Sequence, residues 1–308
     1  MTPDTRKGRE TVVASPVRVT YFYQSAFTVA MEKTLMVFSY RQTGLEQLAR
    51  EQWLSDRDFQ GFNNILVFVP SASAAHHDKA IYEWKQSFPF TYVMPQEAAK
   101  LAPRAANVRV CREGDSFSVG HCEVTAYGSS DAGLSFLAEA EGVRVYHAGD
   151  LNLWHWREEN TLRDIARSEA LFYEKTALLP KDGIDVSMFP LDPNQGGYYD
   201  AGANHFIMAV RPRVFFPMHF GSRAEIAAEY ARRGLSRRTV VFALTQVRES
   251  ASVDLSGATP LVRSSIPSAS ERGRLRAARV DLSAYGHEDP FSQTDLPVDL
   301  REEGSPPA

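Results

Sequence analysis

The sequence predicts one folded domain of the α/β (α+β) class, and three observations indicate it. Short apolar runs typical of buried strands alternate with stretches typical of helices. Hydrophobic residues make up 44% of the 308 residues and charged residues 23%, as in a globular protein with a sizeable core. Apolar residues become sparse beyond about residue 248. We therefore expect a polar N-terminal segment (1–15), a folded domain (16–248) and a largely disordered C-terminal tail (249–308).

The apolar runs locate the strands. Residues 17–23 are rich in β-branched and aromatic side chains, and residues 65–69 are continuously apolar, as in a strand covered on both faces. Two hairpins are expected, one across residues 113–115 and the other across residues 141–142. The predicted strands cover residues 17–23, 34–40, 65–69, 108–111, 118–127, 134–140, 143–146, 184–189, 213–217 and 239–244.

Helical spacing of apolar side chains predicts three helices. Ile81, Trp84 and Phe88 recur at intervals of three and four residues, which is typical of one apolar helix face. Two further helices are expected at residues 203–210 and 224–233, and Gly234 would end the second of them.

Charge and composition exclude several classes of function. The 34 Lys and Arg residues against 38 Asp and Glu leave a formal charge of −4, so no basic excess indicates nucleic acid. No apolar run approaches the roughly 20 residues of a membrane span, and residues 1–15 lack a signal-peptide core. With only Cys111 and Cys122, a cytoplasmic location is expected, and both are interpreted as reduced strand cysteines rather than a cross-hairpin pair.

Side chains able to bind a metal occur in three loops, each directly after a predicted strand. His76, His77 and Asp78 follow residues 65–69, the segment 147–156 follows residues 143–146, and His219 follows residues 213–217. Side chains at strand ends are held by a rigid scaffold while one side stays open to substrate. One such histidine alone is more often a satisfied polar residue. Three such loops in order indicate a functional site.

These loops resemble those of metal-dependent hydrolases with the metallo-β-lactamase fold, and the resemblance spans about residues 17–244. The segment before His76 has the layout of the family's H-x-H-x-D-H loop. Similar motifs follow at residues 128–133, 147–156, 189–193 and 217–220. The resemblance implies a four-layer αββα metallo-β-lactamase-like sandwich with its active site along one edge, between the two sheets.

Several positions depart from the pattern of this family. The first two histidines of the loop fall on Ser71 and Ser73, and its aspartate falls on Ala75. Gln24 replaces a histidine, and Ser39 replaces an aspartate at the end of the second strand. Hydroxyls are poor replacements for imidazole on an ion such as zinc. The site of two metal ions is therefore expected to be degenerate.

The resemblance also implies a set of site residues. The remaining ligands are His76, Asp150 and His219. They are enough for one zinc, iron or manganese ion at most. The alternative is that the site binds no ion. Asp150 and Asp131 are the candidate catalytic carboxylates. Two residues of the implied pocket wall, Trp154 and Trp156, are equally well interpreted as core residues. Asp192 is also interpreted as part of a turn. The wall comprises His147, Asn152, Trp154, His155, Trp156 and Asp192.

Two functions follow from this ligand set. In the first, the chain has lost two-metal hydrolysis and keeps a pocket for a small molecule. In the second, it is an active mononuclear hydrolase whose single metal activates water. Asp78 or Asp131 would then take the role of the loop aspartate that Ala75 replaces. The fold does not select a substrate, and the pattern predicts neither partner nor oligomeric state.

Overall fold

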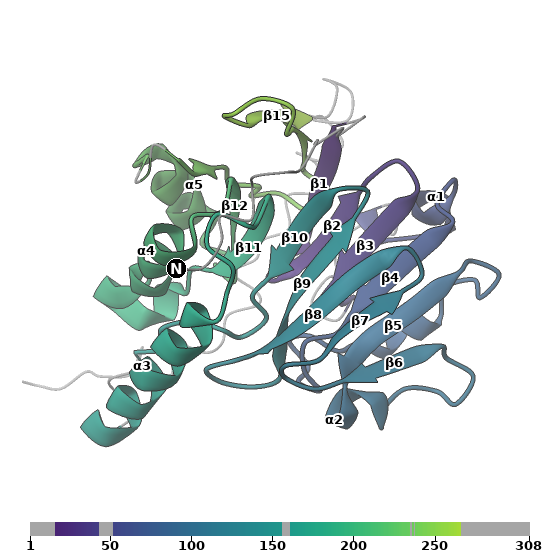
Figure 1. Ribbon diagram of the computed structural model, residues 1–308, viewed down its shortest axis with the longest axis horizontal. Coiled ribbons are helices and arrows are strands. Elements are labelled where there is room, and N and C mark those ends of the chain that lie inside the picture. The colour runs from purple at the N-terminus through teal and green to yellow at the C-terminus, as the bar shows by residue number, and fades with distance from the viewer. Residues whose placement is uncertain (1–15, 43–51, 156–160, 235, 237, 266–308) are drawn as a thin grey trace, which may run out of the picture.

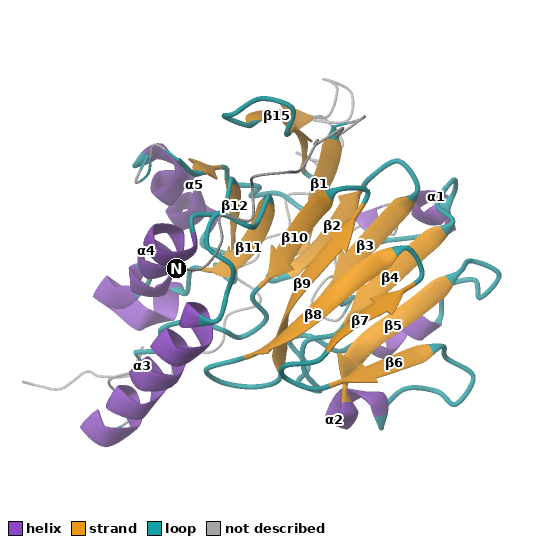
Figure 2. Ribbon diagram, in the orientation of Figure 1, coloured by secondary structure: helices purple, strands orange, loops and turns teal. Residues whose placement is uncertain are grey.

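The computed structural model describes residues 16–42, 52–155, 161–234, 236 and 238–265, and two sheets form its centre (Figure 1). One sheet has eight strands in the order β15-β14-β1-β2-β3-β4-β5-β6. The other has seven, in the order β13-β12-β11-β10-β9-β8-β7. Helices α3, α4 and α5 lie on one outer side and α1 and α2 on the other (Figure 2). The predicted αββα layering is confirmed.

Both sheets mix parallel and antiparallel pairs. Strands β3 to β6 are parallel in the first sheet, and β10 to β13 in the second. The eight-stranded sheet contains β1 (Val17–Tyr23), β2 (Ala26–Ala30), β3 (Thr34–Phe38), β4 (Asn64–Phe68), β5 (Phe90–Pro95), β6 (Val108–Cys111), β14 (Ser250–Asp254) and β15 (Leu261–Ser265). The seven-stranded sheet contains β7 (Ser116–Val119), β8 (Cys122–Gly128), β9 (Leu134–Ala140), β10 (Val143–His147), β11 (Val186–Pro190), β12 (Val214–Met218) and β13 (Val240–Val241).

The helices are short except for α3, whose first turn is closed by a capping box between Thr161 and Asp164. The α-helices are α1 (Asp56–Phe59), α2 (Gln96–Ala99), α3 (Leu162–Ala177), α4 (Ala201–Val210) and α5 (Ala224–Arg232). Two 3₁₀ turns, η2 (Lys79–Tyr82) and η3 (Pro193–Tyr198), follow the loops after β4 and β11. Among the described helices, none is long and apolar enough to cross a membrane.

Two apolar clusters form the core. The larger lies between the sheets and under α3 to α5, with Phe68, Phe136 and Phe206 among its members. The smaller lies on the outer face of the eight-stranded sheet and includes Phe59 and Trp84. Because β3, β4, β11 and β12 are buried along their whole length, their loops start from fixed positions.

Several predicted elements need correction. Residues 108–111 and 118–127 do not pair across residues 113–115, because β6 pairs with β5 while β7 and β8 form their own hairpin in the other sheet. The predicted helix through Ile81, Trp84 and Phe88 is only the turn η2, and these side chains fill the smaller core cluster instead. Strand β13 is shorter than the predicted 239–244. The hairpin across residues 141–142 is confirmed by the pairing of β9 with β10.

The eight-stranded sheet continues beyond the predicted domain boundary at residue 248. Strand β14 pairs with β1, and Ala251, Val253 and Leu255 are buried. In the sequence this strand has a polar character, because its buried side chains alternate with more exposed ones. Residues 1–15, Trp156 and residues 266–308 lie outside the described residues. Cys111 and Cys122 are free and buried, one in each sheet.

Candidate functional site

The predicted site residues gather where five strands end. Ser39 follows β3, His76 lies in the loop after β4, and Asp150 comes three residues after β10. Asp192 follows β11 and His219 follows β12. Since these neighbouring strands end at one edge of the sandwich, their loops meet there, as ligand-binding loops do in open α/β sheets. The site can be described from the side chains that these loops carry.

His76 lies at the centre of the site and is completely buried. Its Nδ1 is 2.8 Å from Ser39 Oγ, and its Nε2 is 2.7 Å from Asp150 Oδ1. Both ring nitrogens are therefore engaged by other side chains of the site.

Asp150 and Asp131 are the two carboxylates of the site whose pKa values are shifted in part by His76. Burial opposes the charge of Asp150, but the attraction and hydrogen bond of His76 outweigh it and hold the pKa of Asp150 below its usual value. The pKa of Asp131 is raised, first by partial burial and then by the charge of Asp150. The two carboxyl groups thus share one site, with Asp131 at its exposed side.

His219 is more open than His76, with 26% of its side chain exposed. Its ring contacts Trp154 at 5.6 Å between centroids, and its Nδ1 lies 3.9 Å from Asp192 Oδ2. That Nδ1 is buried and has no hydrogen-bond partner among the described residues. After His76, His219 also contributes to the lowered pKa of Asp150. The joint role of His76, Asp150 and His219 as metal ligands stays a prediction.

His147 holds the backbone rather than facing a ligand. Gly149 N–H donates to its Nδ1 at 3.1 Å, and its Nε2 donates to Ser25 O at 2.8 Å. Burial lowers its pKa to about 3, which keeps the ring neutral in this tautomer. The ring also stacks on Phe38 at 5.1 Å. Its contribution to the predicted pocket wall is to position Gly149, next to Asp150.

The segment that follows Asp150 presents several buried polar side chains. Trp154 Nε1 donates to Asp150 O at 2.8 Å, which fixes the turn. The side-chain amide of Asn152 is buried and neither of its atoms has a partner in the described part of the chain. His155 stacks on Tyr198 at 4.8 Å between centroids.

Two side chains that sequence reasoning missed hold His155. Its Nε2 lies 2.7 Å from Glu169 Oε1 on α3, and its backbone N–H donates to Gln195 Oε1 at 2.6 Å. The Thr161-x-x-Asp164 capping box was the available signal for α3, and hence for Glu169. We find no sequence signal for Gln195.

The altered loop residues interact with one another. Ser71 Oγ lies 2.9 Å from Ser73 Oγ, and Ser71 is buried while Ser73 is exposed. Asp78 caps η2, accepting from Ala80 N–H and Gln42 N–H, both at 2.9 Å. The carboxylate of Asp78 thus holds backbone groups, and its suggested role as a base, like that of Asp131, stays a prediction.

Ser39, His76 and Asp150 form a hydrogen-bonded chain in the order of a catalytic triad. A nucleophile must also meet its substrate. Ser39 is only 1% exposed and lies beneath His76, so its Oγ cannot reach a substrate carbonyl. Ser39 is therefore a positioning residue.

The backbone of the site adopts rarely populated conformations. Gln24, Ser39 and His219 have φ values of 53°, 50° and 64°, in the left-handed region that non-glycine residues seldom occupy. His219 N–H donates to Gln24 O at 3.0 Å, which joins two of these positions. Such outliers cluster at functional sites, so the conformation supports a functional interpretation of this edge.

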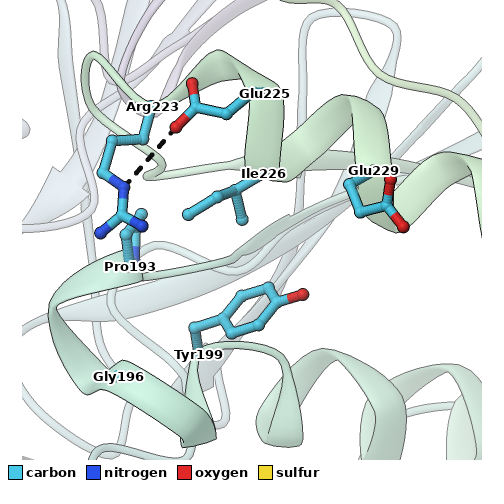
Figure 3. Close-up of a pocket in the computed structure, with 7 residues that line it drawn as sticks. All are labelled: Pro193, Gly196, Tyr199, Arg223, Glu225, Ile226 and Glu229. Atoms are coloured by element: carbon cyan, nitrogen blue, oxygen red, sulfur yellow. Dashed lines mark ion pairs between the residues drawn. The ribbon is translucent and has the colours of Figure 1, made fainter.

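A cavity of about 410 Å³ lies beside the loops that carry Asp192 and His219 (Figure 3). Pro193 and Arg223 border it, and the Tyr199 ring faces Ile226 across it. Arg223 Nε is 3.7 Å from Glu225 Oε1, in an exposed ion pair. The volume is in the range of small-molecule sites.

Comparison with known proteins bears on the fold of this chain. No family model matches the chain. A UPF0173 metal-dependent hydrolase of Opitutus terrae is 26% identical over 246 residues, covering 71% of this chain and 94% of that protein. The metallo-β-lactamase-fold protein YhfI of Bacillus subtilis matches with a TM-score of 0.50 and 9% identity, over 81% of this chain and 99% of that one.

The chain has the metallo-β-lactamase fold. Igni18, a metallo hydrolase of Ignicoccus hospitalis, matches with a TM-score of 0.56 and 17% identity, over 78% of this chain and 100% of that one. The fold expectation and the resemblance are confirmed. The predicted roles of individual site residues stay predictions.

The donor set at this site differs from the one that the resemblance to metallo-β-lactamase-fold hydrolases implies. Ser71, Ser73 and Ala75 stand at three loop positions where that resemblance implies metal ligands. His76 Nε2 lies 2.7 Å from Asp150 Oδ1, so these two side chains are hydrogen-bonded to each other. Within the described residues, no group of three or more His, Cys, Asp or Glu side chains is arranged to hold a metal.

Proposed function

We propose that this chain is a metallo-β-lactamase-fold hydrolase homologue that has lost two-metal hydrolysis and keeps its site for binding a small molecule. The observation that carries the proposal is the engagement of both nitrogens of His76, by Ser39 and by Asp150. A histidine ligand must present a free nitrogen lone pair to its metal. Here the donors that would coordinate an ion stabilise each other instead.

The altered loop supports the same conclusion. A hydroxyl pair at Ser71 and Ser73 offers weak, neutral donors to a divalent ion. Ala75 offers no donor at all, so neither a metal nor an attacking water is oriented from this position.

The binding role is supported by polar atoms without partners in the loops around His76 and Asp150. Asn152 and Gln195 are both more than nine-tenths buried, yet the Asn152 amide and Gln195 Nε2 have no hydrogen-bond partner among the described residues. His219 Nδ1 is also buried and without a hydrogen-bond partner among these residues. Buried polar atoms are nearly always satisfied, by water or ligand where not by protein. A polar small molecule at this edge would satisfy them.

Metal analysis of the purified protein tests the proposal. We expect less than about 0.1 zinc, iron or manganese ion per chain after preparation without chelator, and an unchanged thermal midpoint when chelator is added. One ion per chain, lost in His219→Ala, would instead establish the mononuclear hydrolase based on His76, Asp150 and His219. That outcome would contradict the proposal.

A gain-of-function variant supplies the matched control. Ser71→His, Ser73→His and Ala75→Asp together restore the H-x-H-x-D-H loop on the same scaffold. We expect this variant to bind zinc, because imidazole and carboxylate replace hydroxyl and methyl groups at the strand end. If wild type and variant bound equal amounts of metal, the loop would not be the reason for the loss.

A further inference from the structure

A second cavity, of about 450 Å³, lies on the outer face of the eight-stranded sheet. Along β1, Val17, Val19 and Tyr21 face the core between the sheets, while Arg18 and Thr20 line this cavity. The cavity is thus separated from the candidate site by its position on the sheet: it faces outward, whereas the site lies at the strand ends.

The charges of this cavity are mostly positive. Arg18, Arg57 and Arg248 line it with one carboxylate, Asp58. Arg248 pairs with Asp58 through two hydrogen bonds of 2.8 Å, so these two charges offset each other. Among the described residues that line the cavity, Asp58 is the one carboxylate, and Arg18 is exposed. Although the chain has a net charge of −4, this surface therefore carries an excess of guanidinium groups.

Three hydroxyl groups from neighbouring strands lie in one row across the cavity. Thr20 of β1 is in register with Thr28 of β2 on one side and with Ser250 of β14 on the other. Arg18 lies two residues from Thr20 along β1 and hence on the same face. Hydroxyl and guanidinium donors together suit the several oxygens of a phosphate group.

The other wall of the cavity is apolar. Phe22, Leu35, Leu54 and Phe62 line it, and the guanidinium of Arg248 lies 5.2 Å above the Phe22 ring. Arg248 itself has a φ of 66°, and its Nε is buried without a partner in the described part of the chain. We propose that this cavity binds a small organic phosphate, with its phosphate on Arg18 and the hydroxyl row and its apolar group against Phe62, the half-buried aromatic side chain of the apolar wall.

Calorimetric titration with phenyl phosphate tests the proposal. We expect saturable one-site binding by phenyl phosphate, weaker binding by inorganic phosphate, and none by benzyl alcohol, which lacks the anion. Arg18→Gln should weaken phenyl phosphate binding at least about tenfold, because it removes charge-assisted hydrogen bonds. Arg104→Gln, an exposed arginine outside the cavity, should leave the affinity unchanged.

The location is tested with a variant of the candidate site. His219→Ala should bind phenyl phosphate as wild type does, since His219 lies outside this cavity. The proposal is overturned by the absence of saturable binding, by an affinity of Arg18→Gln within about twofold of wild type, or by loss of binding in His219→Ala. Unchanged thermal midpoints of the ligand-free variants exclude unfolding as the cause of weaker binding.

Discussion

At the scale of single residues, His76 links the two halves of the site. It is buried, and the two side chains that engage it come from the ends of β3 and β10, on different sheets. A buried imidazole without partners would be costly, so Ser39 and Asp150 each stabilise the ring in place. The buried imidazole is thus satisfied locally, by hydrogen bonds within the protein.

Removal of the Ser39 hydroxyl should expose the importance of this arrangement. Ser39→Ala leaves His76 Nδ1 without its partner in a fully buried position, and we expect a loss of about 1–3 kcal/mol in the free energy of unfolding. Chemical denaturation measures it. Ser116→Ala, which removes an exposed hydroxyl bonded to Thr125, should cost less than about 0.5 kcal/mol. Equal losses would show that His76 does not depend on Ser39.

A glycine beside the loop gives a second prediction at this scale. Gly133 has a φ of 69°, and a Cβ atom there would lie 2.1 Å from Pro70 O, whose carbonyl also accepts from Leu134 N–H at 2.9 Å. Gly133→Ala therefore combines backbone strain with a clash against the start of the loop that carries His76.

Gly114→Ala is the matched control, because Gly114 has a φ of 86° but open space around its Cβ position. We expect this control to lose about 1–2 kcal/mol from the left-handed conformation alone. Gly133→Ala should lose on the order of 3 kcal/mol or more in the same denaturation experiment. Similar losses for both variants would mean that the Pro70 loop moves aside freely.

The sequence predicts part of this site. The three loops could be placed because each follows an apolar strand, and the convergence of His76, Asp150 and His219 follows from parallel strands ending at one edge. The bond between His76 and Asp150 could not be predicted, because its length depends on side-chain positions of two loops 74 residues apart. Nor could the partners of His147, since both are backbone groups.

At the scale of elements, the sequence is most accurate in predicting strands that are buried on both faces. Strands β4 and β12 appear as continuous apolar runs. Helix α3 was missed because only Ile165, Phe172 and Thr176 of its sixteen residues are buried, so its apolar stripe is thin. Strand β14 was missed for a similar reason, since its inward side chains are interrupted by serines.

Truncation tests the part that β14 plays. Ending the chain after Ser265 should leave the thermal midpoint unchanged, because β14 and β15 are retained. Ending it after residue 248 removes buried Ala251, Val253 and Leu255 and frees the edge of β1. Since full burial of one Val or Leu side chain contributes about 1.5–3 kcal/mol, we expect a loss of several kcal/mol or aggregation. If a chain that ends at residue 248 were as stable as the full chain and did not aggregate, the folded domain would end at residue 248, as predicted.

At the scale of the whole molecule, a long-range ion pair joins the segment before β14 to α1. Arg248 binds both oxygens of Asp58, 190 residues earlier in the chain, and also donates to Trp53 O. Burial opposes the charge of Asp58, but the hydrogen bonds and charge of Arg248 outweigh it and hold its pKa below the ordinary value of 3.8. The pair thus stabilises the fold only while Asp58 is ionised.

This stabilisation is complete above pH 3.8 and is lost as the pH falls through the lower pKa of folded Asp58, because the unfolded chain takes up the proton first. Asp58→Asn should therefore cost about 1.5–3 kcal/mol at pH 7 and much less near pH 3, as measured by urea unfolding at both values. Asp254→Asn, on a fully exposed carboxylate, should cost little at pH 7. A pH-independent cost at Asp58 would mean that its shape, and not its charge, holds Arg248 in place.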